Sequence, residues 1–298
     1  MSGTNQGEAQ RGGMPFALGA YLIWGFLPLY FKLLHDVPPL EVVAWRVLFT
    51  LPLCLAIVTM RGQWPEMRAI FTSPRTLARL ALSAVLVAAN WVIYVAAVQQ
   101  GHVLAASLGY YINPLLNILL GTVFLSERLN RARWAAVAIA ACGIALLLWG
   151  AVEMLALALT LAVSFALYGL VRKLTPVGAV PGLATETILL LPAAGAVAAW
   201  YGAAPAGSAL MHGIGTALLL VGSGVLTAVP LLMFAVAARR LDLSTLGFVQ
   251  FMSPTIAFVL GLLAFDEPLA PVKLVCFVLI WVAIALFTGD MLRRRPPR

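Results

Sequence analysis

The sequence predicts an all-α integral membrane protein, with ten transmembrane helices arranged as two inverted repeats of five helices. Three observations predict this fold class: an excess of apolar residues, apolar runs that recur along the whole chain, and a self-match at an offset of 140 positions. Of the 298 residues, 62% are hydrophobic and 10% are charged. Soluble domains have roughly 45–50% apolar and about 25% charged residues. A soluble core cannot hide this excess.

The formal charge of +8 does not indicate a nucleic-acid partner, because the basic residues punctuate apolar segments instead of gathering on one soluble face. Cys54, Cys142 and Cys276 each lie inside an apolar run without a CxxC spacing or a nearby histidine. We therefore expect no metal or redox site and no cofactor.

A hydrocarbon core about 30 Å thick needs about 20 apolar residues in a helix. Lipid admits only helices or closed barrels, and the period-two alternation of barrel strands is absent. The predicted spans are 16–34, 40–60, 79–98, 103–125, 132–150, 154–171, 183–201, 214–236, 244–264 and 270–289.

Basic residues fall on one side of these spans, and positive loops stay in the cytoplasm. The other side has Lys32 and Lys273, and Arg46 lies within a span. The asymmetry predicts that both termini are cytoplasmic. The sixteen residues on the cytoplasmic side are Arg11, Arg61, Arg68, Arg75, Arg79, Arg128, Arg131, Arg133, Arg172, Lys173, Arg239, Arg240, Arg293, Arg294, Arg295 and Arg298.

The predicted organisation is a first repeat over 16–150 and a second, inverted repeat over 151–290. We expect 1–15 to be a disordered cytoplasmic tail, because it is too polar to pack. Residues 291–298 form a basic cytoplasmic tail whose arginines can contact anionic membrane lipid.

The self-match pairs residue types that rarely coincide by chance. The pattern P-x6-G-x5-E occurs in both halves in one register, together with matched basic and aromatic positions. The aligned pairs are Lys32 with Arg172, Pro52 with Pro192, Tyr94 with Phe234, Ala97 with Ala237, Pro114 with Pro254, Gly121 with Gly261, Glu127 with Glu267, and Arg133 with Lys273.

Five spans per repeat is an odd number, so the second copy enters the membrane from the opposite face. Inverted repeats are typical of secondary transporters, which expose a central site to either side in turn. A duplicated scaffold and a dual-topology channel remain alternatives. The chain carries no HExxH helix, GxSxG elbow or Walker A loop, so we do not expect an enzyme.

Three segments carry a family resemblance: 18–34 (LGAYLIWGFLPLYFKLL), 83–129, which includes ASLGYYINPLLNILLG, and 243–261 (LSTLGFVQFMSPTIAFVLG). They resemble the RarD branch of the EamA permeases, in the drug/metabolite transporter (DMT) superfamily, over roughly residues 15 to 290. The resemblance implies the EamA/DMT fold and a permease of the bacterial inner membrane, with export as the expected direction. It also implies a link to chloramphenicol sensitivity, a phenotype that does not make chloramphenicol the substrate.

Ionisable residues inside spans are functional candidates, because a charge costs about 2.5–3.5 kcal/mol at the bilayer centre. Two of them stand out. They are Arg46 and Glu186, which are repeat mates of opposite charge. We expect a solute site near the pseudo-twofold axis to bring them together as a salt bridge or gate. The alternative is that each snorkels to the interface.

Aromatic and amide side chains on the third, fourth and ninth spans complete the predicted solute site. Helical spacings of three and four place several on one face, and such a lining suits a small, partly polar organic solute. Interhelical hydrogen bonding is the alternative. The predicted residues are Asn90, Trp91, Tyr94, Tyr110, Tyr111, Asn113, Asn117 and Gln250.

The sequence therefore predicts a secondary transporter that moves a small organic metabolite or drug-like solute by alternating access. A channel-like facilitator or a non-transporting scaffold are the alternatives. A proton is a candidate coupling ion, since no ATP site is present in the sequence. A monomer and a homodimer are both compatible with the sequence.

Overall fold

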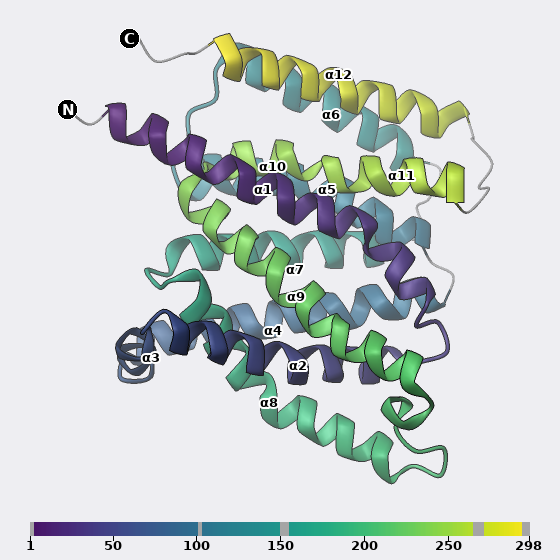
Figure 1. Cartoon of the computed structure of the whole chain (residues 1–298). Coiled ribbons are helices and arrows are strands. Elements are labelled where there is room, and N and C mark those ends of the chain that lie inside the picture. The colour runs from purple at the N-terminus through teal and green to yellow at the C-terminus, as the bar shows by residue number, and fades with distance from the viewer. Residues whose placement is uncertain (1–2, 101–102, 150–154, 265–270, 294–298) are drawn as a thin grey trace. The chain divides into compact units, whose positions relative to one another are not determined.

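The computed structural model describes residues 3–100, 103–149, 155–264 and 271–293, and these residues form helices and turns without a strand (Figure 1). The helices are α1 (Gly3–Lys32), α2 (Pro39–Met60), α3 (Trp64–Phe71), α4 (Pro74–Gln99), α5 (Val103–Phe124), α6 (Arg131–Trp149), α7 (Leu155–Leu174), α8 (Ala179–Ala203), η2 (Ala209–Met211), α9 (Ile214–Arg240), α10 (Leu243–Gln250), α11 (Met252–Ala264) and α12 (Pro271–Arg293).

Six stretches of the described residues are long and apolar enough to cross a membrane. Two shorter apolar stretches, Tyr110–Phe124 and Val278–Asp290, accompany them. The predicted all-α membrane class is confirmed, and most of the described part of every predicted span is helical. The count of ten spans stays a prediction. The six stretches are Gly12–Lys32, Pro39–Met60, Pro74–Ala97, Ala156–Leu174, Ala179–Ala203 and Ile214–Arg240.

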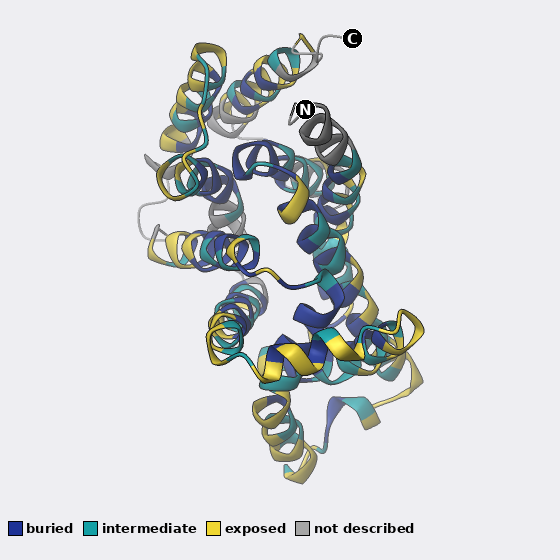
Figure 2. Ribbon diagram, turned by 90° about the vertical axis from the view of Figure 1, so that its left-hand side faces the viewer, coloured by how far each residue is buried: buried dark blue, intermediate teal, exposed yellow. Residues whose placement is uncertain are grey.

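The chain divides into two compact units, and each takes helices from both halves of the sequence. Unit 1 comprises 1–26, 102–166 and 237–298, and unit 2 comprises 27–101 and 167–236. Within the units, buried residues line the faces on which helices meet, and exposed residues occupy outward faces and loops (Figure 2). The expected boundary between the repeats, at 150 and 151, lies outside the described residues.

Helix starts keep the sequence offset of 140. Four helices of the first half each have a mate that begins 140 positions later. The pairs of first residues are Pro39 and Ala179, Pro74 and Ile214, Val103 and Leu243, and Arg131 and Pro271.

In unit 2 the mates α2 and α8 pack against each other in antiparallel directions (Figure 1). Glu66, which follows α2, accepts a hydrogen bond at 2.5 Å from the backbone N–H of Gly178, the residue that precedes α8. Glu41 in the first turn of α2 accepts bonds from Ser208 Oγ at 2.6 Å and from the N–H of Ala209 at 2.8 Å, both beyond the end of α8. Each end of one helix therefore meets the opposite end of its mate.

Unit 1 repeats this arrangement with α5 against α10 and α6 against α12. Glu127, just after α5, accepts bonds from the N–H groups of Leu243 at 2.7 Å and Ser244 at 3.0 Å, at the start of α10. Asp290 near the end of α12 accepts a bond at 3.0 Å from Arg133 Nε near the start of α6. Glu127 therefore caps the start of α10. Its repeat mate, Glu267, lies outside the described residues.

The cytoplasmic tail expected over 1–15 stays a prediction, and the structure continues α1 back to Gly3. Arg240 explains how the polar stretch is held: Nη1 donates at 3.1 Å to the carbonyl of Gly12, and its guanidinium lies 5.5 Å from the ring centroid of Phe16. A Cβ on Gly13 would come within 2.9 Å of Leu241, so only glycine permits this approach. The tail predicted from 291 begins within α12, which ends at Arg293.

Close backbone approach at Gly224 gives a test of the packing in unit 2. A Cβ there would lie 2.6 Å from the backbone carbon of Phe49 on α2. We expect Gly224→Ala to lower the free energy of unfolding by about 1–3 kcal/mol, the usual cost of overpacking. Thermal unfolding of the detergent-purified protein measures it. The control is Gly215→Ala on the same helix, where a Cβ meets nothing within 4 Å. Equal stability of the two variants would contradict the packing of α9 on α2.

Candidate functional site

Arg46 lies in the first half of α2 and is 4% exposed. Its Nε donates at 2.9 Å to Thr227 Oγ1 on α9. Its guanidinium carbon lies 4.8 Å from the ring centroid of Trp91 on α4 and 5.3 Å from that of Phe31 on α1. A cation over aromatic faces is worth about 2 kcal/mol when desolvated. Four helices therefore contribute to holding this charge inside unit 2.

Further predicted residues surround this guanidinium. Tyr94 lies one turn from Trp91, and its ring centroid is 6.0 Å from that of Phe31 in an edge-to-face contact. Tyr30 and Tyr94 both interact electrostatically with Arg46. Asn90, also on α4, is buried. We call Arg46, Phe31, Trp91, Tyr94 and Thr227 the Arg46 cluster; the arrangement combines a fixed charge, a hydroxyl and flat apolar surfaces.

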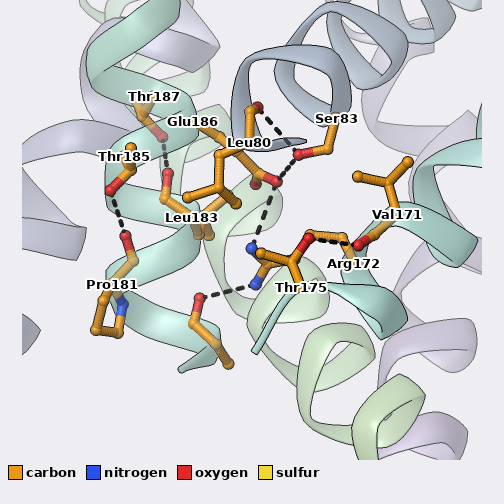
Figure 3. Close-up of polar contacts among 11 residues, drawn as sticks. Leu80, Ser83, Val171, Arg172, Thr175, Pro181, Leu183, Thr185, Glu186 and Thr187 are labelled. Atoms are coloured by element: carbon orange, nitrogen blue, oxygen red, sulfur yellow. Dashed lines mark hydrogen bonds and ion pairs between the residues drawn. The ribbon is translucent and has the colours of Figure 1, made fainter. Parts of the chain in front are cut away.

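Glu186 lies in the first half of α8 and is 1% exposed. Its Oε1 forms an ion pair at 3.4 Å with Nη1 of Arg172, near the end of α7, and accepts the hydroxyl of Ser83 on α4 (Figure 3). Arg172 is 4% exposed, and its Nη2 also donates at 3.3 Å to the carbonyl of Ala179. We call Glu186, Arg172 and Ser83 the Glu186 cluster, which joins three helices of unit 2.

The expected salt bridge between Arg46 and Glu186 is wrong: Glu186 pairs with Arg172. The reason lies in the antiparallel packing of α2 and α8. Each residue lies seven positions after the first residue of its helix, in helices of 22 and 25 residues. Equal positions in antiparallel mates lie near opposite ends of the pair, so their side chains cannot meet.

Four residues of these clusters were not predicted as site residues from the sequence: Phe31, Arg172, Ser83 and Thr227. Arg172 lies one position beyond the predicted sixth span and was counted among the cytoplasmic charges, although it is buried. Two features of the sequence could have marked Arg172 as a site residue: it is the repeat mate of Lys32, and it lies 14 residues before the intramembrane Glu186. Ser83 and Thr227 carried no signal beyond being hydroxyl residues inside apolar spans.

The remaining predicted site residues lie in unit 1. Asn117 Nδ2 donates to Gln250 Oε1 at 2.7 Å and to Asn113 Oδ1 at 3.1 Å, while Asn113 Nδ2 donates at 2.8 Å to the carbonyl of Ala162 on α7. Tyr111 donates its hydroxyl at 3.0 Å to the carbonyl of Pro254. These amides join α5 to α10 and α7. Tyr110 is partly exposed.

Glycine and proline allow the approach of α5 and α10. A Cβ on Gly247 would lie 2.7 Å from the carbonyl oxygen of Pro114. The predicted ninth span divides at Phe251 into α10 and α11, because Pro254 has no N–H to donate to the carbonyl four residues earlier. Pro114 is accommodated within the continuous helix α5.

Comparison with known proteins identifies the fold and the class. Residues 11–149 match the EamA-like transporter family. Protein RarD of Salmonella typhi is 45% identical over 284 residues, which cover 94% of this chain and 95% of that protein. The chain belongs to the EamA-like transporter family. It is a multi-pass membrane protein of a bacterial transporter family. Some of its relatives, such as one from Pseudomonas aeruginosa, are named as uncharacterized transporters, which fits a protein that is not an enzyme.

Other relatives agree with this assignment. Protein RarD of Escherichia coli strain K12 is 44% identical, over 94% of this chain and 95% of that protein. The Chloramphenicol-sensitive protein RarD of Pseudomonas aeruginosa is 30% identical, over 94% and 95% of the two chains. One solved crystal structure, 19% identical, has a TM-score of 0.73 and covers 95% of this chain and 99% of that one, which shows the shared fold.

The amide contacts of unit 1 allow a double-mutant cycle. We expect Asn117→Ala and Gln250→Ala to be coupled by about 0.6 kcal/mol, the average for hydrogen bonds between transmembrane helices, and by no more than about 1.7 kcal/mol. Thermal unfolding of both single variants and the double variant measures the coupling. Asn117→Ala combined with Gly215→Ala is the control pair and should be additive. Additivity in the Asn117 and Gln250 pair would contradict their contact.

Proposed function

We propose that this protein is a secondary transporter that moves a small organic metabolite or drug-like solute across the bacterial inner membrane by alternating access. The family supports a membrane transporter. The mechanism is supported by the mates α2 and α8, α5 and α10, and α6 and α12, which begin 140 positions apart and pack antiparallel. Halves related in this way can exchange conformations.

The proposed orientation places both termini in the cytoplasm, because sixteen basic residues fall on that side of the predicted spans. The burial of Arg172 removes one of these from the loops and leaves the asymmetry intact. In this orientation α2 enters from the outer face, so the Arg46 cluster lies toward the outside. The start of α8, with the Glu186 cluster, lies toward the cytoplasm.

The Arg46 cluster is the observation that carries the proposed solute site. Its guanidinium supplies a fixed donor for a polar or anionic group, and the faces of Trp91 and Phe31 supply contact area for an apolar ring or chain. The solute class that fits is an amphiphile with one polar end. We assign Asn113, Asn117 and Gln250 to holding α5 against α10 and α7, because their amides bind one another.

A transport assay tests the proposal. Purified protein in proteoliposomes is screened for uptake of amino acids, aromatic metabolites and chloramphenicol, with and without a pH gradient. We expect saturable uptake of at least one solute, and a fall of at least tenfold in Arg46→Ala, since loss of one charged contact costs about 1.4 kcal/mol or more.

Two variants control for folding and for charge. Arg61→Ala removes an exposed arginine just after the same helix and should transport as the wild type does. Arg46→Lys keeps the charge but loses the planar guanidinium, so it should retain part of the uptake. Wild-type flux equal to that of empty liposomes for every solute would contradict the proposed function, and an unaffected Arg46→Ala variant would contradict the proposed site.

A further inference from the structure

Only one oxygen of the Glu186 carboxylate has partners among the described residues. Its Oε1 binds both Arg172 and Ser83, whereas Oε2 is buried and has no hydrogen-bond partner among the described residues (Figure 3). A buried carboxylate oxygen without a donor is costly, because nothing replaces the water it has lost. The buried Oε2 therefore costs folding free energy and contributes no hydrogen bond to the packing of the helices.

Arg172 is held in a way that does not depend on the carboxylate alone. Its Nη2 donates to the carbonyl of Ala179, and its guanidinium lies against Gly182 on α8. A Cβ on Gly182 would overlap Nη1 of Arg172. Glycine at this position therefore lets the guanidinium lie flat between α7 and α8, one turn before Glu186.

The charged and titratable groups around Glu186 come from each helix packed on it. Tyr168 and Arg172 face it from α7, Cys54 faces it from α2, and α4 contributes the neutral hydroxyl of Ser83. Near the start of α8, Glu66 of α3 accepts a hydrogen bond from the N–H of Gly178. At the end of α7, Arg79 of α4 donates to the carbonyl of Leu174. The charge balance at Glu186 is thus set by its pair with Arg172.

We propose that Oε2 of Glu186 is the binding site of a coupling proton, and that the ion pair with Arg172 is broken when the proton binds and re-formed when it leaves. The proposal rests on the proposed transport function. A hydronium ion transfers a proton to a lone pair of Oε2: one O–H bond of the hydronium breaks, one O–H bond to Oε2 forms, and a water molecule is released. The net charge of the Glu186 and Arg172 pair rises from zero to +1.

Proton binding changes the contacts of three helices unequally. Oε1 of the neutral acid still accepts the hydroxyl of Ser83, so α4 stays joined to α8. The attraction between Glu186 and Arg172 loses its ionic part, and Arg172 keeps its bond to the carbonyl of Ala179. The end of α7 is therefore the element whose hold on α8 weakens, which links proton occupancy to helix packing in unit 2.

The test compares transport driven by a pH gradient with exchange of labelled for unlabelled solute at equal pH. In the wild type a pH gradient should accelerate uptake several-fold. Glu186→Gln, which resembles the neutral acid and cannot release a proton, should lose this acceleration and keep at least half of the exchange rate. If Glu186→Gln keeps the acceleration by the pH gradient, the proton site is overturned. The same holds if the wild type transports solute but is not accelerated by the gradient. Either result leaves the proposed transport function standing.

Two glycine variants on α8 separate the role of Arg172 from general damage. Gly182→Ala displaces the guanidinium without changing any charge, so the pH profile of uptake should move to higher pH, because a nearby cation favours the ionised carboxylate. Gly195→Ala is the control, since a Cβ there meets nothing within 4 Å, and its profile should match the wild type. An unshifted Gly182→Ala profile would contradict coupling through Arg172.

An infrared measurement keeps the proposal testable if no solute is found. Difference spectra of the purified protein between high and low pH should contain a protonated-carboxyl band that is absent from Glu186→Gln. Identical spectra of the wild type and the variant would overturn the proton site independently of transport.

Discussion

The antiparallel packing of repeat mates is the constraint on which the rest of the structure depends. In lipid each helix satisfies its own backbone except at its ends, where the first N–H groups have no intrahelical partner. Carboxylates from the mate's end fill part of this need: Glu66 binds the N–H of Gly178, and Glu127 binds those of Leu243 and Ser244. The same hydrogen bonds therefore cap a helix start and join that helix to its repeat mate, and they hold α2 against α8 and α5 against α10 in antiparallel directions.

The same constraint separates the chemistry of the two ends of unit 2. Because α2 and α8 are antiparallel, a residue near the start of one helix lies far from its repeat mate on the other. Arg46 consequently meets the hydroxyl of Thr227 and aromatic faces, whereas Glu186 meets a second arginine and a serine. One end carries a cation among aromatic rings, and the other carries a neutralised ion pair. The two repeats therefore carry different chemistry at matched positions, while the helix starts keep their spacing.

Much of the fold could be predicted from the sequence. Apolar runs of about 20 residues locate the helices, and the recurrence of Pro, Gly and Glu at an offset of 140 identifies the repeat. Partner choice could not be predicted, because it depends on helix direction and register, which a one-dimensional pattern does not carry. The positive-inside count placed Arg172 in a loop because its helix ends only two residues later. The contact of Arg240 with the carbonyl of Gly12 in α1 could not be predicted either, because the two residues lie 228 positions apart.

Counterflow in proteoliposomes tests the central claim, that the repeats form an alternating-access carrier, most directly. Vesicles are preloaded with unlabelled solute, and uptake of a trace of labelled solute is measured at equal pH on both sides. The account predicts that preloading produces a transient overshoot of label above its equilibrium level, because a carrier returns through the membrane with solute bound. A labelled influx that is insensitive to the unlabelled solute inside would contradict the account, because an open channel conducts each molecule independently.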